Sequence, residues 1–134
     1  VIATNLSGAI NVIAAALPVM RAGGGGVMIH TASLAGRHHM PAAGVPYGAS
    51  KHALVALSAS LNAAEGRHGI RSTALCPGEV ATPLLLKRPG FDPGLMQWMI
   101  QPEDVAELAL TVARMNPAVA IHEIVFAPLQ RDSK

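Results

Sequence analysis

Hydrophobic residues along the chain follow two different spacings, which separate helices from strands. From Thr4 to Met20 the apolar positions recur every three or four residues, which places them on one side of a helix. Short continuous apolar runs such as Val27–Thr31, bounded by glycine or proline, are typical of buried strands. These patterns predict helices over residues 4–20, 47–65 and 102–115, and strands over 27–31, 70–76 and 120–126.

The predicted helices and strands alternate through the whole chain. Parallel strands need a crossover between them, usually a helix, so this alternation predicts βαβ units and a parallel sheet covered on both faces. The expected fold class is therefore α/β, with three strands and flanking helices. We see no internal repeat and no interdomain linker, so we expect residues 1–134 to form a single domain.

Composition narrows the classes of protein that fit this chain. Of its 134 residues 51% are hydrophobic and only 13% are charged, against about 25% charged in ordinary globular domains. A chain this apolar can bury a core and is not disordered. A surface so poor in charge also predicts a protein neighbour.

Charge, cysteine content and segment length exclude further classes. The net charge is +2, and the basic residues stand singly without interleaved aromatics, so we expect no nucleic-acid partner. The single cysteine, Cys76, cannot form an intramolecular disulfide, which fits a reducing, cytoplasmic compartment. The apolar run Val12–Met20 contains Pro18 and stops at Arg21, short of the roughly 18 residues that cross a bilayer. We therefore expect no membrane segment.

Residues able to move a proton follow the ends of the predicted strands. Ligands of open α/β sheets bind beyond the carboxyl ends of the strands, which draws attention to Ser33 and to the Pro77-Gly78 turn. Tyr47 and Lys51 are four residues apart at the start of a helix and so share one face. A neighbouring ammonium favours the ionised form of a phenol, so the two form a candidate proton-transfer pair. Ser33 can orient a carbonyl or hydroxyl, while moving a hydride requires a nicotinamide.

Four segments, in this order, resemble the classical short-chain dehydrogenases/reductases. They are Thr4-Asn5-Leu6, Thr31-Ala32-Ser33-Leu34-Ala35-Gly36, Tyr47-Gly48-Ala49-Ser50-Lys51 and Cys76-Pro77-Gly78-Glu79-Val80-Ala81-Thr82. The resemblance implies a Rossmann-like doubly wound parallel sheet. It also implies an oxidoreductase that uses NAD or NADP to interconvert a small-molecule alcohol and a carbonyl. The choice between the two cofactors stays open.

The resemblance gives each candidate site residue a role. Tyr47 resembles the general acid/base, Lys51 the residue that favours its ionisation and holds the nicotinamide ribose, and Ser33 the substrate-orienting hydroxyl. Asn5 resembles the fourth catalytic member, which holds a water that links Lys51 to solvent. The implied cofactor-binding residues are Tyr47, Lys51, Pro77, Gly78, Val80 and Thr82. Residues 84–100 fall where the family has its mobile substrate-binding loop.

The chain departs from the family pattern in two ways. Tyr47 lies 14 residues after Ser33, one more than in the family, which a one-residue insertion within 37–46 would accommodate. Gly23–Gly26 precede a strand and lack the G-x-G-x-x-G spacing, so the family's dinucleotide-binding turn has no counterpart here. Because the chain also opens on Val1 in mid-pattern, we expect the C-terminal half of the fold, inactive alone and prone to aggregate at its open strand edge.

The resemblance also implies partners and a range of substrates. Members of the family commonly form dimers and tetramers through two long helices, and the alanine-rich sides of residues 5–20 and 47–64 suit close packing. We therefore expect a homodimer or homotetramer. The segments 101–106 and 120–128 resemble members acting on small hydroxy acids, amino-acid alcohols or assorted alcohols.

Other interpretations of the same residues stay open. Ser33 with His38 or His39 suits a serine hydrolase, although Thr31–Ala35 lacks the glycines of a G-x-S-x-G elbow. A non-catalytic oligomerising fragment would retain the site residues as relics, with Ser33 and Asn5 acting as helix caps. The six histidines lack ligand-type spacing, so we expect no metal site. Cys76 is expected to be a buried, inert thiol with no cation beside it.

Overall fold

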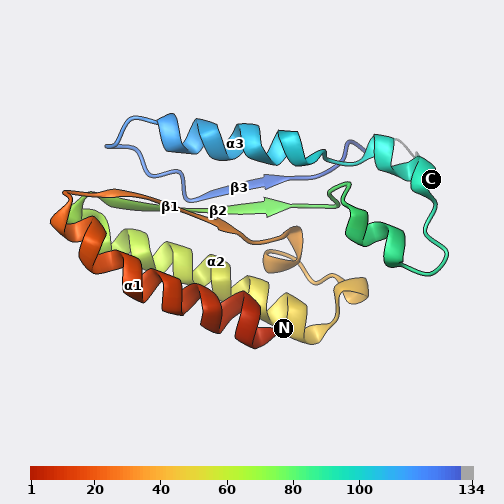
Figure 1. The fold of residues 1–134 in the computed structure, drawn as a ribbon, viewed down its shortest axis with the longest axis horizontal. Helices are drawn as coiled ribbons and strands as arrows, with labels where there is room; N and C mark the ends of the chain where they lie inside the picture. The colour runs from red at the N-terminus through yellow and green to blue at the C-terminus, as the bar shows by residue number, and fades with distance from the viewer. Residues whose placement is uncertain (131–134) are drawn as a thin grey trace.

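The computed structural model describes residues 1–130, which form three layers around a parallel sheet (Figure 1). The strands run β1-β2-β3 in spatial order, with both neighbouring pairs parallel. Helices α1 and α2 cover one face of the sheet and α3 covers the other (Figure 1). The predicted α/β class and the doubly wound arrangement are confirmed. The elements are α1 Gly8–Ala22, β1 Gly26–Thr31, α2 Val45–Glu65, β2 Ile70–Pro77, α3 Pro102–Arg114 and β3 Glu123–Phe126.

All three strands point the same way, so their carboxyl ends lie at one end of the molecule (Figure 1). The first turns of α1 and α2 lie at that end, because both helices run antiparallel to the strands. The segment between β2 and α3 also lies there. Two short 3-10 turns interrupt it, Pro83–Lys87 and Pro93–Trp98, where the sequence predicts irregular structure.

The core lies between the central strand and α2. From Ser72 to Pro77 every residue of β2 is buried, as expected for a strand covered on both faces. Ala74 and Cys76 pack with Leu54 and Val55 of α2 in one cluster. The continuous apolar run in the sequence thus corresponds to the strand in the middle of the sheet.

Strand β3 is shorter than the sequence predicts. The predicted strand covers 120–126, whereas β3 covers Glu123–Phe126 and pairs with the second half of β2, from Ala74 to Pro77. Ala74 does donate a hydrogen bond to the His122 carbonyl at 3.0 Å. The hydrogen-bonded pairing of β3 with β2 therefore starts only at Glu123. Before that residue the chain leaves the 116–119 turn and approaches β2.

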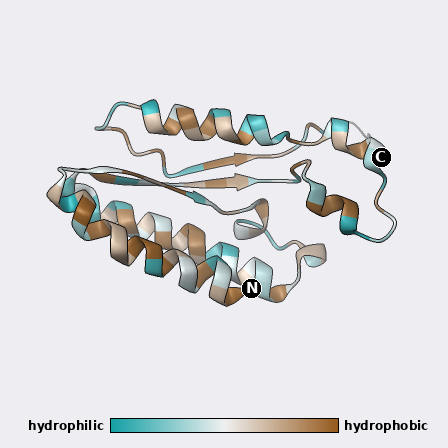
Figure 2. Cartoon of the chain, viewed as in Figure 1, coloured by the Kyte–Doolittle hydropathy of each residue, from teal (hydrophilic) through white to brown (hydrophobic). Residues whose placement is uncertain are grey.

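The first helix is longer than the sequence predicts, and so is the apolar stretch that it carries. A π-helical turn, Ala3–Ser7, precedes α1, and Pro18 lies inside the helix without ending it. The resulting stretch Ala3–Ala22 is 20 residues long with mean hydropathy 1.4, so by length and composition alone it can cross a membrane. Hydrophobic residues recur along α1 in Figure 2. Val12 and Val19 are 69% and 73% exposed, so this apolar surface is uncovered within residues 1–130.

Candidate active site

Ser33 follows the carboxyl end of β1 and starts a tight turn. Its backbone is extended, and its hydroxyl accepts a hydrogen bond from the Ala35 N–H at 3.1 Å, so it caps the 3-10 turn Leu34–Gly36. The local bond explains the placement, because a serine at this position satisfies an amide that the turn leaves without a partner. The capping role considered from the sequence is therefore confirmed, and Ser33 as a residue is partly exposed beside the end of the sheet.

Tyr47 and Lys51 lie one turn apart at the start of α2. The Lys51 ammonium is 5.6 Å from the centroid of the Tyr47 ring, within the range of a cation–π contact. The same ammonium donates a hydrogen bond to the Thr31 carbonyl at 2.7 Å. Lys51 therefore links the start of α2, which carries Tyr47, to Thr31 at the end of β1. Thr31 lies two residues before Ser33.

The Lys51 ammonium is partly buried. Burial lowers the pKa of its ammonium, and an electrostatic interaction with Cys76 opposes that effect. Burying a cation disfavours its charged form. The Thr31 carbonyl compensates in part, since it accepts one of the three ammonium protons.

A glycine lets the turn that Ser33 caps approach α2 closely. Gly36 is buried against the backbone of Lys51, and a Cβ at this position would lie 2.8 Å from the Lys51 carbonyl oxygen. No other residue type fits here without displacing backbone. The serine turn and the tyrosine–lysine turn are thus in direct contact, although no hydrogen bond joins the side chains of Ser33 and Tyr47 within residues 1–130.

Asn5 lies in the π-helical turn before α1 and reaches across to α2. Its side-chain N–H donates to the Ser50 hydroxyl at 3.2 Å, and Ser50 donates to the Tyr47 carbonyl at 2.7 Å. From the sequence, Ser50 stands only as part of a motif and has no role of its own. Its signal is present in the spacing, because it directly precedes Lys51 and is a polar residue on the buried side of α2.

The turn after β2 has a regular, strand-like course. Gly78 donates to the Phe126 carbonyl at 2.8 Å, and Val80 forms an isolated parallel bridge with Ile100. In this bridge Ile100 accepts from Ala81 and donates to the Glu79 carbonyl. The backbone N–H and C=O of Val80 itself therefore point away from Ile100. Pro77 ends β2, and Thr82 precedes the turn Pro83–Lys87.

Cys76 is fully buried at the end of β2, as the sequence predicts, but the expectation of no neighbouring cation was wrong. Burial raises the pKa of its thiol, and the charge of Glu123 raises it further. The Ser33 backbone N–H, Arg37 and Lys51 act in the opposite direction. These interactions also show that the end of β2 lies beside both Ser33 and Lys51.

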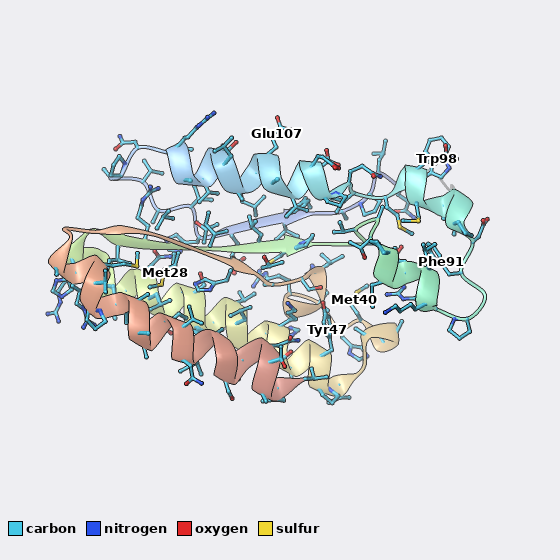
Figure 3. The ribbon with its side chains drawn as sticks, viewed as in Figure 1. Met28, Met40, Tyr47, Phe91, Trp98 and Glu107 are labelled. Carbon is cyan, nitrogen blue, oxygen red and sulfur yellow. The ribbon has the colours of Figure 1, made fainter. Side chains whose placement is uncertain are left out.

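The segment between β2 and α3 lies beyond the sheet, at the end that carries Tyr47. Figure 3 shows Phe91 and Trp98 on this segment and Tyr47 and Met40 at the same end of the molecule. Trp98 is half exposed, as are Leu86 and Leu95. The segment thus presents apolar side chains near the candidate site.

Comparison with known proteins gives the family. The pattern that defines the short chain dehydrogenases matches residues 1–89. A sulfoacetaldehyde reductase of Chromohalobacter salexigens is 30% identical over 96% of this chain. A 2,5-dichloro-2,5-cyclohexadiene-1,4-diol dehydrogenase of Sphingobium indicum is 41% identical over 62% of this chain. The chain belongs to the short-chain dehydrogenase family.

Solved structures agree with this assignment. A 3-oxoacyl-[acyl-carrier protein] reductase of Brucella melitensis with bound NAD is 29% identical, with a TM-score of 0.75 over 90% of this chain and 46% of that chain. The closed form of a serine dehydrogenase complexed with NADP⁺ is 26% identical, with a TM-score of 0.82 over 98% of this chain and 56% of that chain. The chain also spans 53% of the sulfoacetaldehyde reductase and 33% of the diol dehydrogenase, about half or less of each relative.

Proposed function

We propose that the intact protein is an NAD(P)-dependent oxidoreductase that interconverts an alcohol and a carbonyl. The observation that carries the proposal is the Lys51 ammonium, 5.6 Å from the Tyr47 ring and bonded to the end of β1. A phenol titrating near 10 is a weak base at neutral pH until a cation stabilises its ionised form. Tyr47 and Lys51 together therefore suit a general acid/base at the carboxyl edge of a parallel sheet, where ligands of such folds bind.

In this mechanism Tyr47 donates a proton to the carbonyl oxygen during reduction and accepts it from the hydroxyl during oxidation. Ser33 binds the same oxygen and orients it. Lys51 stabilises the phenolate, and Asn5 takes part in returning the proton to solvent. The dinucleotide supplies or accepts the hydride when it is bound.

The residues present fit the nicotinamide end of such a cofactor. A carboxamide has one donor face and one acceptor face, and the outward N–H and C=O of Val80 match both. The Lys51 ammonium suits ribose hydroxyls as a donor. We propose Tyr47, Lys51, Pro77, Gly78, Val80 and Thr82 as the residues that would hold the nicotinamide half. Nothing in residues 1–130 discriminates NAD from NADP.

We further propose that residues 84–100 cover a small substrate. The apolar side chains of Leu86, Leu95 and Trp98 are partly exposed there, and such residues commonly line small-molecule sites. Similarity to a sulfoacetaldehyde reductase and to a serine dehydrogenase supports a short hydroxy acid, amino-acid alcohol or the matching carbonyl as substrate.

We propose a homodimer or homotetramer in the cytoplasm, associated through α1 and α2, with no nucleic-acid or membrane partner. The exposed valines of α1 support association, because an uncovered apolar helix face is a common protein interface. The same face supports the alternative function, a non-catalytic oligomerising fragment. Membrane association of the full-length protein on fractionation would contradict the cytoplasmic proposal.

The direct test of cofactor use is titration of the full-length protein with NADH and with NADPH, followed by nicotinamide fluorescence. Binding of one of the two, with turnover of a short hydroxy acid or aldehyde at 340 nm, is the expected result. Binding of neither, with a stable oligomer, would favour the non-catalytic alternative.

A further inference from the structure

Ser50 is a fully buried serine between Tyr47 and Lys51, with hydrogen bonds on two sides. Its hydroxyl donates to the Tyr47 backbone carbonyl at 2.7 Å and accepts from the Asn5 amide at 3.2 Å. The residue has 0% exposed surface, so water does not replace these bonds. One hydroxyl therefore connects the start of α1 to the turn that carries the candidate proton-transfer pair.

The bond to Tyr47 acts on a helix start that has no side-chain cap. The N-cap residue of α2, Gly44, has no side chain to cap the first turn, and Val45 is 80% exposed. Pro46 contributes no backbone N–H. A helical serine bonded back to a carbonyl three residues earlier changes the local geometry of that turn and often bends it. This bond is made at the backbone of the residue that carries the phenol.

The bond to Asn5 ties the same turn to a second helix. Asn5 belongs to the π-helical turn Ala3–Ser7, which contacts α2. A π turn is wider than an α turn, and such turns occur frequently at functional sites. The start of α1 is thus connected to the start of α2 at the end of the molecule where the strands finish (Figure 1).

We propose that Ser50 is a positioning residue, whose hydroxyl couples Asn5 to the first turn of α2 and so sets the placement of the Tyr47 phenol beside the Lys51 ammonium. The inference rests on the proposed function, because Ser50 acts only through Tyr47 and Lys51. Its burial keeps it from touching substrate.

The chain offers a matched control in Ser58. This serine is on the same helix, also has 0% exposed surface, and bonds to the Ser72 hydroxyl at 2.8 Å in the core, away from the tyrosine. Replacing either serine by alanine removes one buried hydroxyl from α2. We therefore expect comparable effects on folding from the two variants, which differ in their distance from the pair.

The experiment compares Ser50→Ala, Ser58→Ala and Tyr47→Phe in the full-length protein, with kcat, KM and the pH dependence of kcat/KM as readouts. Ser50→Ala is expected to lower kcat about tenfold and to shift the pH profile upward by about one unit, with KM within about threefold. Ser58→Ala should lower the Tm by a similar amount without moving the pH profile. Ser50→Thr, which retains the hydroxyl, should restore the wild-type profile.

Each outcome separates the two proposals. If Tyr47→Phe abolishes turnover while Ser50→Ala has the pH profile of Ser58→Ala, the positioning role is wrong and the proposed function stands. If Tyr47→Phe retains turnover, both are wrong. The role of the hydroxyl would also be overturned if the pH profile of Ser50→Thr shifted as far as that of Ser50→Ala. The shift would then come from the change in side-chain volume and not from loss of the hydrogen bond.

Discussion

Gly36 lies so close to Lys51 that a methyl group at its Cα would come within 2.8 Å of the lysine carbonyl oxygen. This contact joins the turn that Ser33 caps to the turn that carries Tyr47. The absence of a side chain at Gly36 therefore lets these two turns lie in direct contact. The contact therefore contributes to the relative placement of the candidate serine and tyrosine.

A methyl group at this contact should disturb both stability and turnover. Gly36→Ala should force the serine turn away from α2, because the opposing atom is backbone and cannot rotate aside. Overpacking of this kind costs about 1–3 kcal/mol, and we expect turnover to fall at least about tenfold from misplacement of the reacting groups. Urea unfolding and kcat/KM of the full-length protein measure both effects.

Gly66→Ala is the control for that substitution. Gly66 has a right-handed helical conformation, and no atom lies within 4 Å of the place that an alanine Cβ would take. The change should therefore leave both stability and turnover close to wild type. Equal effects of the two substitutions would mean that the Gly36 contact does not set the site.

The buried His30 should make stability depend on pH. Its ring bonds to the Ser72 hydroxyl at 2.9 Å, and Ser72 bonds to Ser58. Burial lowers the pKa of His30 below its ordinary 6.5. Below pH 6.5 the His30 ring therefore binds a proton more readily in the unfolded chain than in the folded chain. The free energy of unfolding decreases as the pH falls. The slope for one proton is at most about 1.4 kcal/mol per pH unit.

Urea unfolding between pH 7 and pH 5 tests this effect. His30→Asn should remove the additional slope, whereas His52→Asn, on the exposed side of α2, should retain it. The hydrogen bond from Arg21 lowers the pKa of Glu65 below its ordinary 4.5. The stability that the Arg21–Glu65 pair contributes is therefore lost only below pH 4.5, outside the range of this test. A wild-type slope unchanged by His30→Asn would contradict the assignment.

The apolar side of α1 should respond to charge if it is an interface between copies. Val12→Asp and Val19→Asp place a carboxylate on side chains that are 69% and 73% exposed. Each change should shift the full-length protein toward monomer by light scattering. Leu84→Asp, at a residue 70% exposed on the 83–87 turn, should leave the oligomer intact. An oligomer unaffected by both valine substitutions would place the interface elsewhere.

The 134-residue chain on its own should associate with itself. Within residues 1–130, β1 pairs only with β2, and its outer edge lines a groove of about 420 Å³ with α1. An open strand edge beside apolar side chains is a template for self-association. The isolated chain should therefore aggregate and bind NADH or NADPH far more weakly than the full-length protein. A monodisperse sample that melts cooperatively would be the opposite result.

Local patterns were sufficient to predict the order of elements and the pairing of Tyr47 with Lys51. Both depend on spacing along a single helix or on runs of apolar residues, which are visible without a structure. The first helix was predicted over 4–20, and the structure extends it by one residue at its start and two at its end, to Ala3–Ala22.

The contacts that hold the candidate site together were beyond prediction for a different reason. The bonds from Lys51 to Thr31 and from Asn5 to Ser50 join residues 20 and 45 positions apart. They depend on how α1 crosses α2 and how α2 lies on the sheet, which no local pattern specifies. The same holds for the cations near Cys76, which come from other segments.

The general acid/base role of Tyr47 is tested most directly by the turnover of the full-length Tyr47→Phe protein at saturating NADH or NADPH. We expect kcat/KM to fall at least about 100-fold, the usual contribution of a general acid/base, while the affinity for the dinucleotide changes by less than about threefold. A Tyr47→Phe enzyme that retains turnover within about threefold of wild type would show that the Tyr47–Lys51 pair does not carry the proton transfer.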